Sequence, residues 1–272
     1  MPCVREAGKK EAETAEADKG VSMKKQFGKI IAVMLLLMVS GVLLLPVVFM
    51  VRKAAPGDFY LLLIEKFWFY PKFWNSLLYA AGIGAGASLL SLLAAFGLTK
   101  GGFRHGKAIS FLLLLLMLMP LQTTLLPNYI GLRDLGLLDT RRALVLPMIC
   151  SPFAIYLMCR YMEGMPDENW EAARLETGSL FQILFHVVFP QMRACAAAVF
   201  VFMFAEGFNM IEQPMYYVKQ DKLKPLSIIT DSMQAGEEPL IYAVGIVCMI
   251  PLLFLYGFYE EELADGLGML KM

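Results

Sequence analysis

Long apolar stretches separated by short polar ones make up most of this chain. Residues 30–51 and 73–99 contain no charged residue. At 1.5 Å per residue, each is long enough to cross a hydrocarbon layer of about 30 Å. Further apolar stretches occupy residues 108–132, 143–159, 194–218 and 240–259. The pattern therefore predicts an all-α membrane protein with six transmembrane helices.

The two ends of the chain differ from this pattern. Residues 1–29 are rich in charge and lack apolar periodicity, which is typical of a disordered tail. Met23, followed by two lysines, is a second candidate start, and use of it would make residues 1–22 dispensable. We expect a membrane domain over residues 30–260 and a short polar tail over 261–272. The apolar part of residues 30–51 exceeds the length of a signal-peptide core, so a retained helix is favoured.

The composition supports a membrane protein and excludes other classes. Hydrophobic residues make up 58% of the chain and charged residues only 18%, whereas a soluble domain carries about 25% charged residues. Lys and Arg are scattered and balanced by Asp and Glu, so no nucleic-acid partner is expected. The five cysteines and two histidines show no spacing typical of metal ligands. We therefore expect no metal and no cofactor.

The third apolar stretch carries polar residues at membrane depth. Gln122 and Asn128 lie beside Pro120 and Pro127. Such residues are tolerated where they are buried within protein or line a cavity. Hydrogen bonds between helices and contact with a ligand are both compatible with this position.

Two carboxylates in the fifth stretch are costly in a membrane. Ionisable residues within a span usually face a cavity or a partner group. Glu206 and Glu212 are six residues apart. On one continuous helix their side chains would be separated by roughly 240°. The spacing therefore predicts that they do not share a face.

A polar segment, residues 163–190, interrupts the apolar pattern between the fourth and fifth stretches. Pro166 suits the first turn of a helix, and Asp167 suits its positive N-terminal end. Thr177-Gly178 predicts the end of this helix, because glycine adopts the left-handed conformation common there. Connections between helices usually need about two to eight residues. The extra length and the helix signals indicate a docking surface.

A second helix is predicted directly after this turn. Ser179 and Gln182 match a capping box, in which each side chain accepts a hydrogen bond from the backbone of the other residue. The residues that follow are strongly apolar, and Pro190 ends the helix or kinks it into the fifth span. Residues 163–190 thus predict a helix–turn–helix, which we call the elbow.

A recognisable pattern lies within the elbow. Glu171, Ala172 and Ala173 are followed by Gly178 and Pro190. This segment resembles the EAA loop of permease subunits of binding-protein-dependent ABC importers. The three residues of the EAA triplet and the proline match that family in type and spacing. Thr177 stands at the glycine position of the family, and Gly178 follows one residue later.

The resemblance implies a type I ABC importer permease fold and a mechanical role for the elbow. The first helix would be a coupling helix in a cleft of a cytoplasmic ATP-binding subunit, with Glu171 facing a basic residue there. The other coupling residues would be Ala172, Ala173, Arg174, Gly178 and Pro190. The implied partners are a second permease in a heterodimer, the ATP-binding subunits and an extracellular solute-binding protein. The chain has no Walker A motif, so it is expected not to be an enzyme.

The same resemblance implies an orientation. A cytoplasmic elbow would place both termini in the cytoplasm. The chain would lie in the plasma membrane of a bacterial cell. Lys and Arg favour this orientation only when the N-terminal tail is counted. The charge pattern by itself therefore leaves the orientation open.

Other segments point to the sugar-importing branch of the family. NSLLYA at 75–80 and GFNMIEQP at 207–214 are similar to the second permease subunit of maltose-type systems. Phe208 stands where the family usually has tryptophan. The implied function is a translocation path for a carbohydrate or a related solute. Candidate residues along this path are Gln122, Asn128, Glu206, Asn209 and Glu212.

Two other classes of membrane protein fit the sequence less well. A stand-alone secondary transporter should show internal repeats and paired broken helices, and no clear repeat is present. An intramembrane enzyme would need a metal motif or paired catalytic groups at membrane depth. A capped elbow between two spans favours the importer subunit over both.

Overall fold

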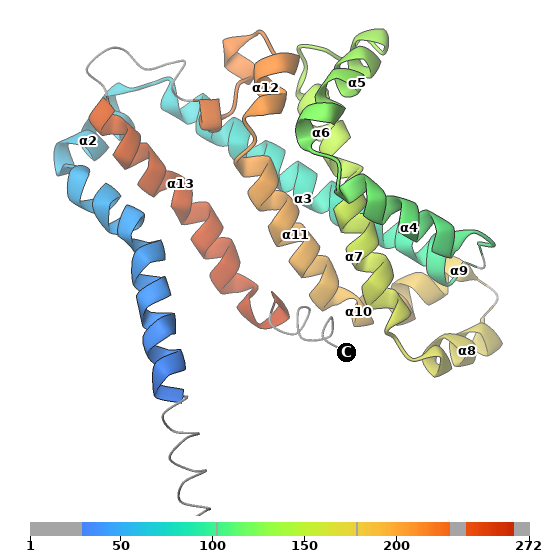
Figure 1. The fold of residues 1–272 in the computed structure, drawn as a ribbon. Helices are drawn as coiled ribbons and strands as arrows, with labels where there is room; N and C mark the ends of the chain where they lie inside the picture. The colour runs from blue at the N-terminus through green and yellow to red at the C-terminus, as the bar shows by residue number, and fades with distance from the viewer. Residues whose placement is uncertain (1–28, 102, 178, 229–237, 264–272) are drawn as a thin grey trace, which may run out of the picture. The chain divides into compact units, whose positions relative to one another are not determined.

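The structure of the chain is a computed structural model (Figure 1), and it describes residues 29–101, 103–177, 179–228 and 238–263. Every regular element in these ranges is helical. The predictions made for residues 1–28, for Gly178 and for residues 264–272 lie outside the described residues. The all-α fold class is confirmed.

The first described element is the helix Lys29–Lys53. It belongs to the first of two units of the chain, and the described elements from Pro56 onward belong to the second unit. The second unit contains α2 (Pro56–Tyr60), a π-helix (Leu61–Glu65), α3 (Phe69–Thr99), α4 (Gly106–Met117), α5 (Leu121–Asp134), α6 (Arg141–Ile149), α7 (Pro152–Glu163), α8 (Asp167–Glu176), α9 (Leu180–Ile183), a second π-helix (Leu184–Val188), α10 (Phe189–Gln191), α11 (Arg193–Phe208), α12 (Glu212–Tyr217), a 3₁₀ turn (Asp221–Leu223) and α13 (Glu238–Phe258).

Four described stretches are long and apolar enough to cross a membrane without a sharp bend: Lys29–Lys53, Phe69–Thr99, Arg141–Glu163 and Leu240–Phe258. Two further pairs of helices qualify only as bent spans, with angles of 106° between α4 and α5 and 77° between Leu180–Gln191 and α11. Six spans are reached when each bent pair counts as one. The expected number of spans is therefore compatible with the structure, but two of them are broken.

The long helix α3 packs against α6, α7 and α11 (Figure 1). Small residues permit this packing, because they let helix backbones approach closely. A Cβ atom added to Gly84 would lie 3.0 Å from the carbonyl oxygen of Phe200 on α11. Ser88 donates a hydrogen bond across the same contact to the carbonyl of Ala196. The small residues of the second apolar stretch thus mark the contact with α11.

The first half of α3 carries a polar face that contacts residues 221–226, which follow α12. Asn75 donates to the carbonyl of Lys222 at 2.8 Å, and the Ser76 hydroxyl accepts from the backbone of Leu226 at 2.8 Å. Lys72 forms an ion pair with Asp221 at 2.9 Å. These contacts give NSLLYA a structural role, because its polar side chains satisfy backbone groups of a segment that lacks long helices.

The third and fifth apolar stretches differ from the continuous helices that their length suggests. The third stretch bends at Pro120, which cannot donate the hydrogen bond that a helix would need there. The fifth stretch leaves the helix after Phe208 and resumes at Glu212. The fourth stretch forms α6 and α7, with an interruption at Cys150 and Ser151. α5, α6 and α12 therefore form one end of this unit, and the elbow lies at the other end (Figure 1).

Candidate functional site

Two features of the second unit are candidate functional sites: the elbow and a cavity at the breaks between helices. The elbow has the predicted order of a short polar helix, a turn and an apolar helix. The first helix, α8, begins at Asp167, directly after Pro166. The second helical stretch runs through α9, the π-helix and α10, and it bends into α11 after Pro190. The helix–turn–helix inferred for residues 163–190 is thus present.

The inner side of α8 is anchored by an aromatic side chain. The ring of Trp170 lies edge-on to that of Phe96 near the end of α3, with 5.6 Å between centroids. Ala173 is buried beside it, and Val187 of the π-helix belongs to the same apolar cluster. A small cavity of about 10 Å³ lies between Trp170, Val187 and Lys100. Trp170 thus ties α8 to the end of α3, and α8 also contacts the π-helix.

The outer side of α8 is exposed. Glu171 and Ala172 lie on this side, and Leu175 is 89% exposed. Glu171 has no ion pair among the residues that the structure describes. Arg174 lies over the ring of Trp170 at 5.6 Å, so it stacks on the anchoring residue. A carboxylate and a large apolar side chain are thus presented on one short helix.

The turn after α8 corrects the predicted capping box. Ser179 makes no side-chain cap hydrogen bond. The Thr177 hydroxyl accepts a hydrogen bond from the Ser179 backbone at 3.2 Å and donates one to the Gln182 side chain at 2.6 Å. Thr177 has an extended backbone, with φ −143° and ψ 137°. An extended residue needs no glycine, which explains why threonine is accepted at the family's glycine position.

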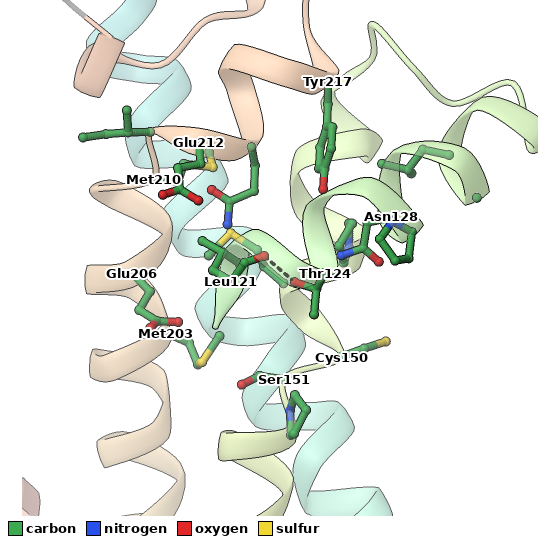
Figure 2. A pocket seen from close by; sticks show the side chains of 18 of the residues that line it. Leu121, Thr124, Asn128, Cys150, Ser151, Met203, Glu206, Met210, Glu212 and Tyr217 are labelled. Carbon is green, nitrogen blue, oxygen red and sulfur yellow. Dashed lines mark hydrogen bonds between the residues drawn. The ribbon is translucent and has the colours of Figure 1, made fainter. Parts of the chain in front are cut away.

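The second candidate site is a cavity of about 920 Å³ at the breaks between helices (Figure 2). Its wall comes from α5, from the junction of α6 and α7, and from the end of α11 with α12. Each of these elements is broken or bent at this level. Irregular backbone is tolerated within a membrane where it lines a cavity. Residues on the wall include Leu121, Thr124, Asn128, Ser151, Met203, Glu206, Asn209, Glu212, Gln213 and Tyr217.

Glu206 and Glu212 both line this cavity, which corrects the expectation that they do not share a face. The helical-wheel argument fails because α11 ends at Phe208 and the chain turns before Glu212. Gln122 donates a hydrogen bond to Glu212 Oε1 at 2.8 Å. The other oxygen, Oε2, is buried and has no hydrogen-bond partner among the described residues. Gln122 thus links α5 to α12, and Oε2 of Glu212 accepts no hydrogen bond from the described residues.

The two asparagines on the candidate path occupy the same wall. Asn128 lies on α5 and points toward the cavity in Figure 2. Asn209 lines the cavity, but its amide donates back to the Ala205 carbonyl at 2.9 Å, so it also closes the end of α11. Phe208, at the tryptophan position of the family, is buried and stacks on Phe204. It therefore contributes to packing and does not line the cavity.

Several lining residues were not anticipated from the sequence. Ser151 accepts a hydrogen bond from the Ala154 backbone at 3.4 Å and caps α7 beside the cavity. The Tyr217 hydroxyl donates to the carbonyl of Leu125 on α5 at 3.2 Å. Pro147 and Pro152 flank the break between α6 and α7, and they are the sequence feature from which this break could have been predicted. Two prolines in one short span predict irregular backbone, and therefore a cavity nearby.

Three comparisons with known proteins agree with these observations. The model of the family described as "Binding-protein-dependent transport system inner membrane component" matches residues 87–261. A relative from Rhizobium radiobacter, the lactose transport system permease protein LacG, is 27% identical over 203 residues, which cover 73% of this chain and 74% of the relative.

Other relatives carry different names. The sn-glycerol-3-phosphate transport system permease protein UgpE of Brucella abortus (strain 2308) is 25% identical over 199 residues, 71% of each chain. The arabinooligosaccharides transport system permease protein AraQ of Bacillus subtilis (strain 168) is 22% identical over 202 residues, 73% of this chain and 72% of the relative.

Among solved structures, a chain of a bacterial ABC transporter involved in the import of the acidic polysaccharide alginate has a similar fold. The TM-score is 0.76 with 19% identity, and the match covers 87% of this chain and 96% of that chain.

Proposed function

This chain belongs to the family of binding-protein-dependent transport system inner membrane components, and we propose that its elbow couples a solute path to separate ATP-binding subunits. It is a bacterial membrane permease of the ABC importer class, and the alternative of a stand-alone secondary transporter is not favoured. The path is formed with a second permease subunit, and an extracellular binding protein delivers the solute. The proposal extends to orientation: the elbow and both termini are cytoplasmic.

One observation carries this proposal. α8 exposes Glu171 and Leu175 on one side, while its other side is fixed to α3 through Trp170 and Phe96. A helix fixed in this way transmits a displacement to the membrane helices with little loss, because packed interiors deform little. An exposed carboxylate and an apolar side chain form a suitable contact for a cleft with a basic residue. The elbow can thus act as a lever.

The cavity supports a neutral solute. The residues of this chain that line it include the carboxylates of Glu206 and Glu212 and contain no Lys, Arg or His. Carboxylates accept hydrogen bonds from hydroxyl groups and repel phosphates and carboxylates. We therefore assign the path to an uncharged carbohydrate, the class in the names of the lactose and arabinooligosaccharide relatives.

The substrate class can be tested in proteoliposomes with the complete transporter. Uptake of lactose and of an arabinooligosaccharide should exceed uptake of sn-glycerol-3-phosphate when each is offered with a binding protein that carries it. Preferred uptake of the phosphate would contradict the assignment from the two carboxylates.

Docking of α8 on the ATP-binding subunit can be tested by cross-linking. Leu175→Cys, in a chain whose native cysteines are replaced, would carry a benzophenone–maleimide photo-cross-linker. Phe67→Cys is the matched control, because Phe67 is 81% exposed and belongs to the segment between the first π-helix and α3. We expect the label at position 175 to capture the ATP-binding subunit and the label at 67 to capture none. Equal capture at both positions, or none at 175, would refute the proposed docking.

A further inference from the structure

A second cavity, of about 680 Å³, lies between the end of α3, the start of α4 and the end of α7. These helix ends lie on the elbow side of the unit (Figure 1). It is separate from the cavity at the helix breaks, and no residue lines both. Gly106, the first residue of α4, is buried in its wall. A Cβ atom there would overlap the carbonyl oxygen of Leu98. α4 therefore begins directly against the last turn of α3, and this contact shapes the cavity.

The polar part of the wall is positively charged. Lys100, Lys107 and Arg160 line the cavity together with one carboxylate, Glu163. Arg160 and Glu163 form an ion pair at 2.6 Å. Lys107 has no hydrogen-bond or ion-pair partner within the described part of the chain. The wall thus carries more cationic than anionic groups, and at least one cation is available to an anion.

The rest of the wall is apolar and continues onto the outer surface of α4. Phe111 and Leu114 line the cavity, and Phe111 is 61% exposed. Leu112 and Leu115 are exposed on the same helix. A cationic cavity at a helix end, joined to an exposed apolar helix surface, matches a molecule with an anionic head and a hydrocarbon chain.

We infer that this cavity binds one anionic phospholipid, with the lipid phosphate at Lys100, Lys107 and Arg160 and an acyl chain along Phe111 and Leu114. Basic pockets between membrane helices on the cytoplasmic side are suited to anionic headgroups. The inference rests on the proposed function only for its placement in the cytoplasmic leaflet. Inorganic phosphate shares the headgroup chemistry, but it has no part that would cover the apolar side of the wall.

Lipid retention tests this inference directly. The purified chain, alone and in the assembled transporter, is reconstituted in phosphatidylcholine nanodiscs that contain a minority of phosphatidylglycerol. Native mass spectrometry then counts the phosphatidylglycerol that stays bound. We expect one retained molecule, and about fivefold weaker retention for Lys107→Gln, because a cation at a membrane surface contributes on the order of 1 kcal/mol. Lys107 is exposed, so the variant should fold normally.

Arg104→Gln is the matched control, since Arg104 is also an exposed cation near the start of α4 but does not line the cavity. Retention by this variant should equal that of the original chain. An equal loss in both variants would indicate diffuse surface attraction and overturn the site, as would no loss for Lys107→Gln. Displacement of the lipid by inorganic phosphate would assign the site to free phosphate. If Lys107→Gln loses the ATP-binding subunit but retains the lipid, Lys107 contacts a protein and not a lipid.

The same measurement is independent of the proposed function. Absence of any assembled transporter would refute the importer proposal, while lipid retention by the chain alone would still support the cavity. Normal assembly and uptake without a retained lipid would refute the cavity and leave the importer proposal intact.

Discussion

Replacement of Trp170 by alanine should loosen the elbow while leaving its docking surface unchanged. Trp170 holds α8 against α3 through its edge-on contact with Phe96. A fully buried tryptophan costs about 3–5 kcal/mol when it is cut to alanine. Trp170 is only half-buried, so we expect about 2 kcal/mol, part of which comes from the aromatic pair. Glu171 and Leu175 would remain exposed.

A loss of this size changes how often α8 separates from α3. About 2 kcal/mol corresponds to a roughly 30-fold change in the ratio of docked to undocked elbow. Hydrogen–deuterium exchange reports this ratio, because backbone amides exchange through local opening. The amides of residues 167–176 should therefore exchange up to about 30-fold faster in Trp170→Ala.

Two variants act as controls for this experiment. Trp170→Phe keeps an aromatic ring at the position and should recover most of the protection. Leu175→Ala removes a side chain that is 89% exposed and should leave protection unchanged in the absence of the ATP-binding subunit. Unchanged exchange in Trp170→Ala would refute the anchoring of α8 on α3. Faster exchange throughout the chain would show that the residue stabilises the whole fold and not the elbow alone.

Two further comparisons test the packing of α3 and the loop that contains Asp139. Gly84→Val should lower the thermal midpoint of unfolding, because its Cβ would crowd Phe200 and overpacking costs about 1–3 kcal/mol. Gly97→Ala is the control, since the space around its Cβ is open, and it should leave the thermal midpoint unchanged or raise it. Equal effects of the two variants would contradict the close contact at Gly84. Asp139 accepts hydrogen bonds from the backbone and side chain of Gln220, which lower its pKa. Its ionised form therefore stabilises the fold above the usual carboxyl pKa, and this contribution disappears as pH falls through the lowered pKa. The thermal midpoints of Asp139→Asn and the original chain should differ at neutral pH and converge in acid, whereas a difference independent of pH would rule out the charge as its cause.

The elbow was largely predictable because its signals are local. Pro166 and Pro190 fix backbone geometry at its two ends, and these restrictions act whatever the surroundings. The capping box was wrong for a local reason as well. Thr177 competes for Gln182 and for the Ser179 backbone, and the sequence pattern does not say which hydroxyl forms these bonds.

The cavity was only partly predictable because it depends on where helices break. Polar residues at membrane depth identified Gln122, Asn128, Asn209 and the two glutamates as candidates. The prediction that Glu206 and Glu212 do not share a face was wrong, because a helical wheel assumes a continuous helix and α11 ends between these two residues. Tertiary contacts such as the Gln122–Glu212 hydrogen bond join segments far apart in the chain, and one sequence does not reveal them.

The partner of the second apolar stretch could not be read from the sequence. Small residues let helices approach closely, but only the structure identifies α11 as the helix that approaches Gly84. The polar residues of NSLLYA had no evident role in the sequence. Their partners are backbone carbonyl and N–H groups of the segment before α13, and such groups are present in every loop.

The proposed function requires α8 to transmit work from the ATP-binding subunits through Glu171. The most direct measurement is ATP-dependent uptake by the complete transporter in proteoliposomes, with Glu171→Lys compared with Glu176→Lys. The two residues are exposed on the same helix, and five positions place their side chains roughly 140° apart. Glu171→Lys should insert normally but lose the ATP-binding subunit and uptake, while Glu176→Lys should retain most of both. Normal uptake by Glu171→Lys would refute the coupling role of this residue.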